Sequence, residues 1–219
     1  MDLVILCDFD GTIITIDTLR FLLEKFTKDN WKTFISQYEQ GKITLKECLD
    51  ILWSKLRLPK NVMLDELERA ASVRPNFKNF LIFCRNHDIP CIISSAGLDF
   101  IVHHFLEIIG YRDQIKIVTL KTIFHDKKVN IMFPKLLNDR SLDFKEDLVK
   151  NYQRNGFQVF FIGDGISDYN ASLNADFSFT IKDSELDIFC KKRGIPHQAI
   201  MDFQDVINVL KNVISSGLK

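Results

Sequence analysis

Short, continuous apolar runs alternate along most of this chain with amphipathic segments, and this alternation limits the possible fold more than any other feature. A strand that is covered on both faces typically has such a run. Four runs and a fifth candidate occupy residues 3–7, 89–95, 115–120, 157–163 and 177–181. Apolar side chains at helical spacing lie between them, in residues 76–88, 98–110 and 144–156. The last two segments end at Gly110 and Gly156, which are suited to terminate helices. The pattern predicts an α/β fold, a doubly wound parallel sheet with helices on both faces.

Residues 17–72 interrupt this alternation. They contain four successive amphipathic helical segments without a convincing strand: residues 17–26, 29–40, 44–56 and 61–72. We therefore predict a helical module inserted after the first strand, so that residues 1–14 and 75–219 form the core domain and residues 15–74 the insertion. Residues 122–133 place two apolar runs around a charged turn, which predicts a β-hairpin. The segments at 189–194 and 203–215 are expected to be helices that cover the sheet.

Composition excludes several classes of partner. Lys plus Arg and Asp plus Glu both number 29, so no global charge would attract nucleic acid or an anionic membrane. The five cysteines are odd in number, widely spaced and set among apolar residues, as expected of free thiols in a reducing compartment. The N-terminus lacks the features of a signal peptide, and no apolar run approaches the roughly 18 residues of a membrane span. We expect a cytoplasmic protein with no nucleic-acid or membrane partner.

Two pairs of aspartates follow buried strands. Asp8 and Asp10 end the first run in the stretch DFDGT, and Asp164 and Asp168 follow the fourth in GDGISD. In open α/β sheets, ligands bind beyond the carboxyl ends of the strands, where both pairs are expected. Gathered carboxylates repel one another unless a cation neutralises them, and their hard oxygens favour Mg²⁺. Gly11 would permit a tight turn that brings backbone N–H groups close to an anion.

Each motif also has a purely structural interpretation. DFDGT could be an ordinary polar turn after a strand, and Asp164 could cap the helix that follows it. Asp168 could be an acid stabilised by the dipole in the first turn of that helix. Capping alone explains poorly why two strand ends each deliver two acids.

Four motifs, in this order, resemble those of haloacid dehalogenase (HAD) superfamily phosphatases: DFDGT (8–12), IISSAG (92–97), FKEDLV (144–149) and GDGISD (163–168). The resemblance covers residues 3 to about 181, and the helical insertion is similar to the cap of the phosphoserine phosphatase-like branch. It implies a HAD-like, Rossmann-like core with a helical cap domain at residues 15–74. Within that branch, DFDGTIIT, RPNF, IISSAGLDF and VNIMFP most resemble one group of metabolite phosphatases.

The resemblance also implies an activity and its chemistry. It predicts a Mg²⁺-dependent phosphomonoester hydrolase that acts on a small phosphorylated metabolite. Asp8 would be the nucleophile that forms an aspartyl-phosphate, and Asp10 would be the general acid and base. The metal would be held by Asp8, by the backbone carbonyl of Asp10 and by Asp164, with Asp168 supporting a bound water or the other ligands.

The remaining expected site residues would contact the phosphoryl group. They are Gly11, Thr12, Ser95, Ala96 and Lys145. Relatives continue their serine motif as Ser-Gly-Gly, whereas this chain has Ser95-Ala96-Gly97, which places close backbone approach at Ala96 in question. Ser94 replaces Ser95 if the strand ends one residue earlier, and Lys150 or Lys135 are substitutes for Lys145.

Two other functions share these motifs. A phosphotransferase or phosphomutase would pass the same aspartyl-phosphate to a hydroxyl group other than water. A non-catalytic, metal-dependent receiver switch also groups acids at strand ends, but it needs neither a second acid for proton transfer nor a lid. The motifs leave the substrate and the oligomeric state open.

Overall fold

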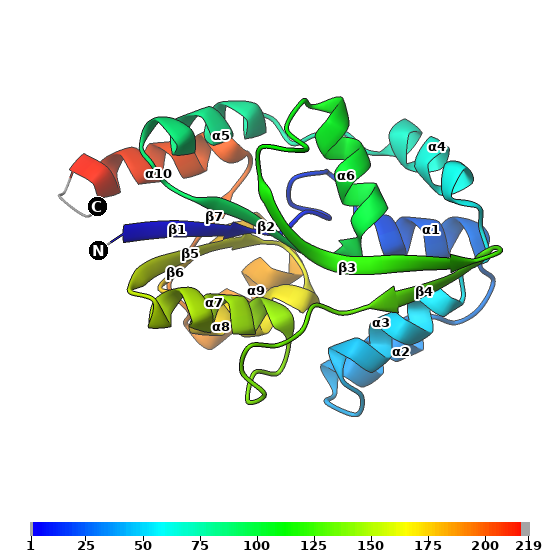
Figure 1. Ribbon diagram of the computed structural model, residues 1–219. Coiled ribbons are helices and arrows are strands. Elements are labelled where there is room, and N and C mark those ends of the chain that lie inside the picture. Colours follow the sequence, from blue (N-terminus) through cyan, green and yellow to red (C-terminus); the bar gives the residue numbers. More distant parts are fainter. Residues whose placement is uncertain (1, 216–219) are drawn as a thin grey trace.

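Strand β1 (Asp2–Cys7) lies in the middle of the sheet, as its unbroken apolar sequence requires. The computed structural model describes residues 2–215, and within this range the sheet has seven strands in the order β4-β3-β2-β1-β5-β6-β7. All neighbours are parallel except β3 and β4. The other strands are β2 (Cys91–Leu98), β3 (Lys116–His125), β4 (Lys128–Met132), β5 (Phe157–Gly163), β6 (Phe177–Ile181) and β7 (His197–Ile200). The predicted doubly wound, mainly parallel sheet is confirmed (Figure 1).

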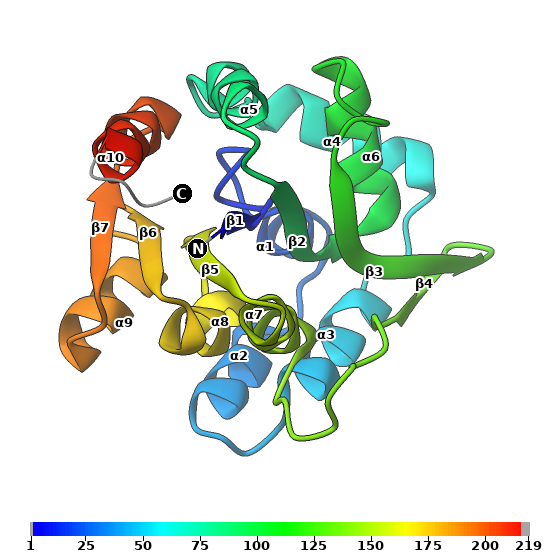
Figure 2. The same cartoon turned by 60° about the vertical axis from the view of Figure 1, so that its left-hand side comes forward.

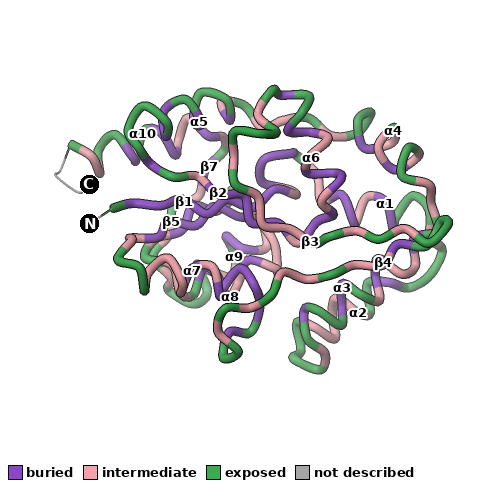
Figure 3. The backbone as a smooth tube through the Cα atoms, in the orientation of Figure 1, coloured by how far each residue is buried: buried purple, intermediate pink, exposed green. Residues whose placement is uncertain are grey.

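Helices cover both faces of this sheet. Helices α5 (Phe77–Asn86), α6 (Asp99–Ile108) and α10 (Phe203–Ser215) lie on one face, and α7 (Phe144–Arg154), α8 (Tyr169–Asn174) and α9 (Glu185–Arg193) lie on the other (Figure 2). Alternate residues of β1 point to the two layers: Leu3, Ile5 and Cys7 join the first apolar cluster, and Val4 and Leu6 join the second. Both faces of β1 are therefore buried, and most of the loop that follows it is buried too, with Asp10 and Gly11 half-buried (Figure 3).

The inserted segment folds into four helices beyond the carboxyl ends of the strands (Figure 1). They are α1 (Thr18–Phe26), α2 (Lys32–Glu39), α3 (Leu45–Ser54) and α4 (Lys60–Ala70). The side chain of Asp17 caps α1, and Thr44 forms a capping box with Glu47 at the start of α3, so the sequence itself sets these helix starts. The chain leaves and re-enters the core through adjacent segments, because Ile14 and Val73 form an antiparallel bridge.

Two features differ in detail from the sequence-based expectation. The predicted hairpin is present, but its first half continues β3 as one strand, and the antiparallel β4 then packs against α3. The C-terminal part contains an additional edge strand, β7, between the two expected helices. Its four residues, HQAI, are too short and too mixed in polarity to show a strand pattern.

The expectation of unpaired, mostly buried cysteines agrees with the structure. All five cysteines are free, and four of them are buried. No helix in the range 2–215 combines the length and apolar character that crossing a membrane would require.

Candidate active site

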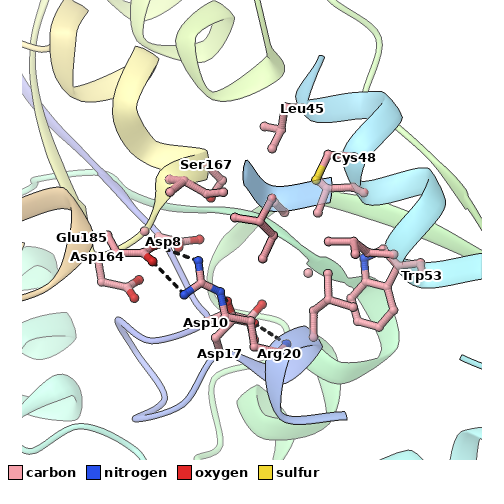
Figure 4. Close-up of a pocket in the computed structure, with 18 of the residues that line it drawn as sticks. Asp8, Asp10, Asp17, Arg20, Leu45, Cys48, Trp53, Asp164, Ser167 and Glu185 are labelled. Carbon is pink, nitrogen blue, oxygen red and sulfur yellow. Dashed lines mark hydrogen bonds and ion pairs between the residues drawn. The ribbon is translucent and has the colours of Figure 1, made fainter. Parts of the chain in front are cut away.

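Three carboxylates from two strand ends meet beyond the sheet. Asp8 follows β1, and Asp164 and Asp168 follow β5, the strand that pairs with β1 in register from Asp2 to Cys7. One oxygen atom from each of the three side chains lies within 4.8 Å of the others. Asp8 and Asp168 are buried and Asp164 is partly buried. Figure 4 shows Asp8 and Asp164 on the core side of the site. The parallel register of β1 and β5 thus brings together acids that are about 156 residues apart.

Lys145 provides the positive charge at this cluster. Its side chain is fully buried, and its Nζ lies 2.8 Å from Asp8 Oδ1 and 2.6 Å from Asp168 Oδ1. It also donates a hydrogen bond to Ser167 Oγ at 3.1 Å. The proposed substitutes lie elsewhere: Lys150 pairs with Glu146 on the same helix, and Lys135 is exposed. Of these lysines, Lys145 contacts the acidic cluster.

Asp168 orders the loop that carries Asp164. Its Oδ2 accepts hydrogen bonds from the backbone N–H groups of Asp164 and Gly165, each at 3.0 Å. Because its Oδ1 is paired with Lys145, both of its oxygens are engaged by the protein. The side chain of Asp164 does not cap the next helix but accepts a hydrogen bond from the Thr12 hydroxyl at 2.9 Å. Asp164 is therefore held by the β1 loop, with Oδ2 left without a hydrogen bond to a described side chain.

The carboxyl group of Asp10 is separate from this cluster. Its Oδ1 accepts a hydrogen bond from the N–H of Thr18, at 3.3 Å, at the start of α1. Its Oδ2 occupies the space where Gly97 lacks a side chain, and a Cβ there would collide with it. The β1 loop thus presents two carboxyl groups to two different surroundings, one beside Lys145 and the other beside the end of β2.

Gly11 and Thr12 support the loop from within. Gly11 has φ of +69°, and a Cβ at this position would collide with the carboxylate of Asp164. Its N–H donates to the carbonyl of Ile16 at 2.8 Å, so this N–H is engaged within the loop. The fully buried Thr12 uses its hydroxyl to hold Asp164. The Gly11 N–H and the Thr12 hydroxyl are therefore both engaged within the loop, and binding of phosphate by either residue stays a prediction.

The end of β2 distinguishes the two candidate serines. Ser95 Oγ accepts a hydrogen bond from Gly97 N–H at 3.0 Å and lies on the side of the strand where Gly97 meets Asp10. Ser94 points to the other side by the alternation of a strand, and its buried hydroxyl has no partner. Ala96 and Gly97 line the cavity described below. The geometry therefore favours Ser95 as the hydroxyl nearest the site.

Burial controls the protonation of the acids. Desolvation raises the pKa of Asp8 well above its usual range, and Asp168 adds to the rise while Lys145 opposes it. Desolvation and the charge of Asp8 likewise raise the pKa of Asp164 well above its usual range. The pKa of Asp10 rises to about 7, mainly through burial and secondly through the charge of Asp17. Burial alone would lower the pKa of Lys145, but Asp168 and Asp8 raise it, so this lysine stays protonated.

A cavity of about 190 Å³ connects these groups with the inserted helices. Its core wall contains Asp8, Asp10, Asp164 and the turn from Gly165 to Ser167. The opposite wall is largely apolar and comes from the insertion: Leu19, Ile35, Leu45, Cys48, Leu49, Leu52 and Trp53. Figure 4 labels Leu45, Cys48 and Trp53 of this wall. Reasoning from the sequence had not identified Asp17, Arg20, Trp53 or Glu185 as cavity residues. Only Asp17, just ahead of an amphipathic helix, carried a local signal, that of a helix cap.

Comparison with protein families and curated proteins gives a consistent result. The family model described as haloacid dehalogenase-like hydrolase matches residues 5–172. Similar curated proteins include the 2-hydroxy-3-keto-5-methylthiopentenyl-1-phosphate phosphatases of Brevibacillus brevis and Geobacillus kaustophilus. They are 28% and 29% identical to this chain, over 96% of both chains in each case. The recognition made from the four motifs is confirmed, as is the closer likeness to one group of metabolite phosphatases.

Solved structures agree on the fold. A phosphoserine phosphatase with a phospho-aspartyl intermediate analogue superposes with a TM-score of 0.71 at 15% identity, over 95% of this chain and 98% of that one. The phosphoserine phosphatase of T. onnurineus gives 0.70 at 16% identity, over 97% and 96%. At this identity the likeness concerns the fold, including the helical insertion.

Proposed function

The chain belongs to the haloacid dehalogenase-like hydrolase family and is a phosphatase, and from this premise we propose that it hydrolyses a small phosphorylated metabolite through an aspartyl-phosphate on Asp8. The observation that carries the proposal is that the two carboxyl groups of the β1 loop lie in different surroundings. Asp8 lies against the buried cation Lys145, whereas Asp10 lies apart from it with a pKa of about 7. One carboxyl group is thus placed to attack, and the other to exchange a proton near neutral pH.

The residues present fit a divalent cation. Asp8 and Asp164 are hard oxygen donors that lie close together, and burial raises the pKa of both, so a divalent cation bound between them would stabilise their ionised forms. We propose that Asp8, Asp164 and the backbone carbonyl of Asp10 hold Mg²⁺, and that Asp168 acts indirectly through the Asp164 loop. The bound ion would supply charge neutralisation for the phosphoryl oxygens and for the attacking carboxylate.

The proposed reaction has two steps. A carboxylate oxygen of Asp8 forms a bond to phosphorus while the bond from phosphorus to the ester oxygen breaks, and Asp10 gives its proton to the departing alkoxide. Asp10, now ionised, then takes a proton from water as the water oxygen attacks phosphorus. The bond between phosphorus and Asp8 breaks, and inorganic phosphate leaves. Asp8 is then again ionised and Asp10 again protonated, as at the start.

Two further groups would assist both steps. Lys145 would balance charge on Asp8 and on the transferring group, and Ser95 would donate its hydroxyl proton to a phosphoryl oxygen. The hydroxyl of Ser95 accepts the Gly97 N–H, so its own proton remains available. We also propose that Ala96 contacts the phosphoryl group, because Ala96 lines the wall of the cavity.

We also propose that residues 15–74 form a cap domain over a core made of residues 1–14 and 75–219. The apolar wall contributed by α1, α2 and α3 supports this division, since a cap that excludes bulk water strengthens charge interactions at the phosphoryl group. The first substrate to test is 2-hydroxy-3-keto-5-methylthiopentenyl-1-phosphate, because the curated relatives are named for it.

The test is a release assay for inorganic phosphate with Mg²⁺, using this compound, phosphoserine, sugar phosphates and p-nitrophenyl phosphate. We expect turnover of at least one metabolite, absent from the Asp8→Asn variant. Product analysis in the presence of alcohols separates hydrolysis from transfer to a hydroxyl group. A long-lived phosphoprotein without turnover would instead indicate a receiver switch and refute the proposal.

A further inference from the structure

Arg20 is the only cationic side chain among the residues that line the cavity from the described inserted helices. It projects from α1 towards the core wall and lies between Glu185 and Asp17 (Figure 4). A free guanidinium in this place would be suited to bind a carboxylate on a substrate. Whether it is free therefore decides which phosphate esters the cavity accepts.

The structure shows that the guanidinium is already paired. Its Nη1 and Nη2 donate to the two carboxylate oxygens of Glu185, at 2.9 and 2.8 Å, in a bidentate pair. Its Nε lies 3.2 Å from Asp17 Oδ2. Each of the three guanidinium nitrogens thus has a carboxylate partner, and the cluster of Arg20, Asp17 and Glu185 carries one net negative charge.

The rest of the wall offers an incoming anion no compensation. The side chains from α1, α2 and α3 are otherwise apolar, apart from Cys48, which donates to the carbonyl of Phe34, and Trp53. Trp53 is 1% exposed and its Nε1 is buried without a partner, so this wall adds no second positive charge. Across the cavity, Asp8, Asp10 and Asp164 add further acidic groups.

We infer that Glu185 and Asp17 determine substrate specificity by neutralising Arg20, so that the cavity takes phosphate esters of uncharged, largely apolar alcohols and rejects those that carry a carboxylate. This inference rests on the proposed function, because it concerns the alcohol part of the substrate whose phosphoryl group meets Asp8. The solved phosphoserine phosphatases share the fold, so phosphoserine is an informative compound to compare.

A matched pair of substrates tests the inference. Isopentyl phosphate and the phosphate ester of β-hydroxypropanoate have the same branched shape, but one ends in two methyl groups and the other in a carboxylate. We expect wild-type kcat/KM to favour isopentyl phosphate by at least about tenfold, because a carboxylate would lose its hydration and meet like charges. Phosphoserine is expected to be as poor as the carboxylate ester.

The Glu185→Gln variant should release part of the positive charge of Arg20 while keeping the shape of the side chain. We expect it to reduce the preference for isopentyl phosphate by about fivefold or more, through a gain in kcat/KM for the carboxylate ester. The matched control is Asp29→Asn, which removes the acid from an ion pair in the insertion, Lys55 with Asp29 at 2.9 Å, whose members do not line the cavity. This control should keep the wild-type ratio.

The outcomes separate the two proposals. If wild-type protein with Mg²⁺ releases no phosphate from any ester, including p-nitrophenyl phosphate, the proposed function fails. If it is active but hydrolyses the carboxylate ester as well as isopentyl phosphate, the specificity inference is wrong, and this comparison needs no variant. An unchanged ratio in folded Glu185→Gln protein, as judged by circular dichroism, would equally overturn it.

Discussion

Replacing Lys145 by Met should destabilise the protein more than almost any other change of a single charged residue. Lys145 is fully buried, and it lies within 2.8 Å of Asp8 and 2.6 Å of Asp168, both of which are also buried. Methionine fills a similar volume but leaves two buried carboxylates without their cation. Breaking a buried ion pair in this way costs about 3–5 kcal/mol, because the remaining charge is uncompensated.

That loss corresponds to a fall in Tm of about 6–20 °C for a chain of this length. The measurement is thermal unfolding followed by circular dichroism at pH 8 in the presence of a chelator, so that no metal ion can replace the lysine. Lowering the pH should shrink the deficit, because protonation of Asp8, whose pKa is already raised by burial, removes one of the unpaired charges.

Lys150→Met is the matched control on the same helix. Lys150 is about one third exposed and pairs with Glu146 one turn away, and pairs of this kind contribute about 0.5 kcal/mol or less. Its Tm should therefore stay within about 2 °C of wild type. If the Tm of Lys145→Met at pH 8 also stayed within about 2 °C of wild type, the buried lysine would not be neutralising the acidic cluster. The proposed role of Lys145 in catalysis would then lose its support.

Three further predictions concern the acids. Asp8→Asn should lower kcat at least about a thousandfold without lowering Tm, since it removes the nucleophile and a buried charge but keeps the shape; phosphate release and thermal unfolding measure both effects. Asp10 has a pKa of about 7 and must be protonated for the first step, so wild-type kcat/KM should fall as pH rises above about 7. Asp10→Asn should lower activity by a factor of about 10²–10⁴ and should no longer show this pH dependence. EDTA should abolish turnover and Mg²⁺ restore it, with Asp164→Ala needing about tenfold more Mg²⁺ for half-maximal rate; turnover that EDTA leaves untouched would contradict the assigned cation site.

Much of the fold was predictable because its signals are local. Unbroken apolar runs identify strands that are buried on both faces, and β1, with alternate residues in two apolar clusters, is the clearest instance. The position of Asp8 and Asp164 then follows, since parallel strands deliver their carboxyl ends to one edge. Strand β7 could not be predicted, because an edge strand of four residues is stabilised mainly by its partner β6.

The parts of the site that escaped prediction depend on long-range packing. Arg20 and Glu185 are 165 residues apart, and neither has a neighbour in the sequence that suggests the other. Lys145 was one of three candidate lysines, and only the docking of α7 against β5 shows which of them is buried. The sequence also did not show why residue 11 is glycine. The N–H of Gly11 donates to the carbonyl of Ile16, and the position requires glycine because φ is positive and Asp164 lies close by.

The site combines groups that oppose one another energetically, and the contacts around it show how the fold keeps them together. Burial raises the pKa of Asp8 and Asp164, which means that enclosure of the site disfavours the ionised forms in which the proposed chemistry uses these two acids. Lys145 neutralises part of this charge permanently, and a bound cation would neutralise more. The inserted helices form one wall of the cavity. The energetic penalty of enclosing the ionised acids should therefore be greatest when these helices lie against the core, and it should be smallest when the cation is bound. We therefore propose that closure of the inserted helices over the site and binding of the cation favour each other.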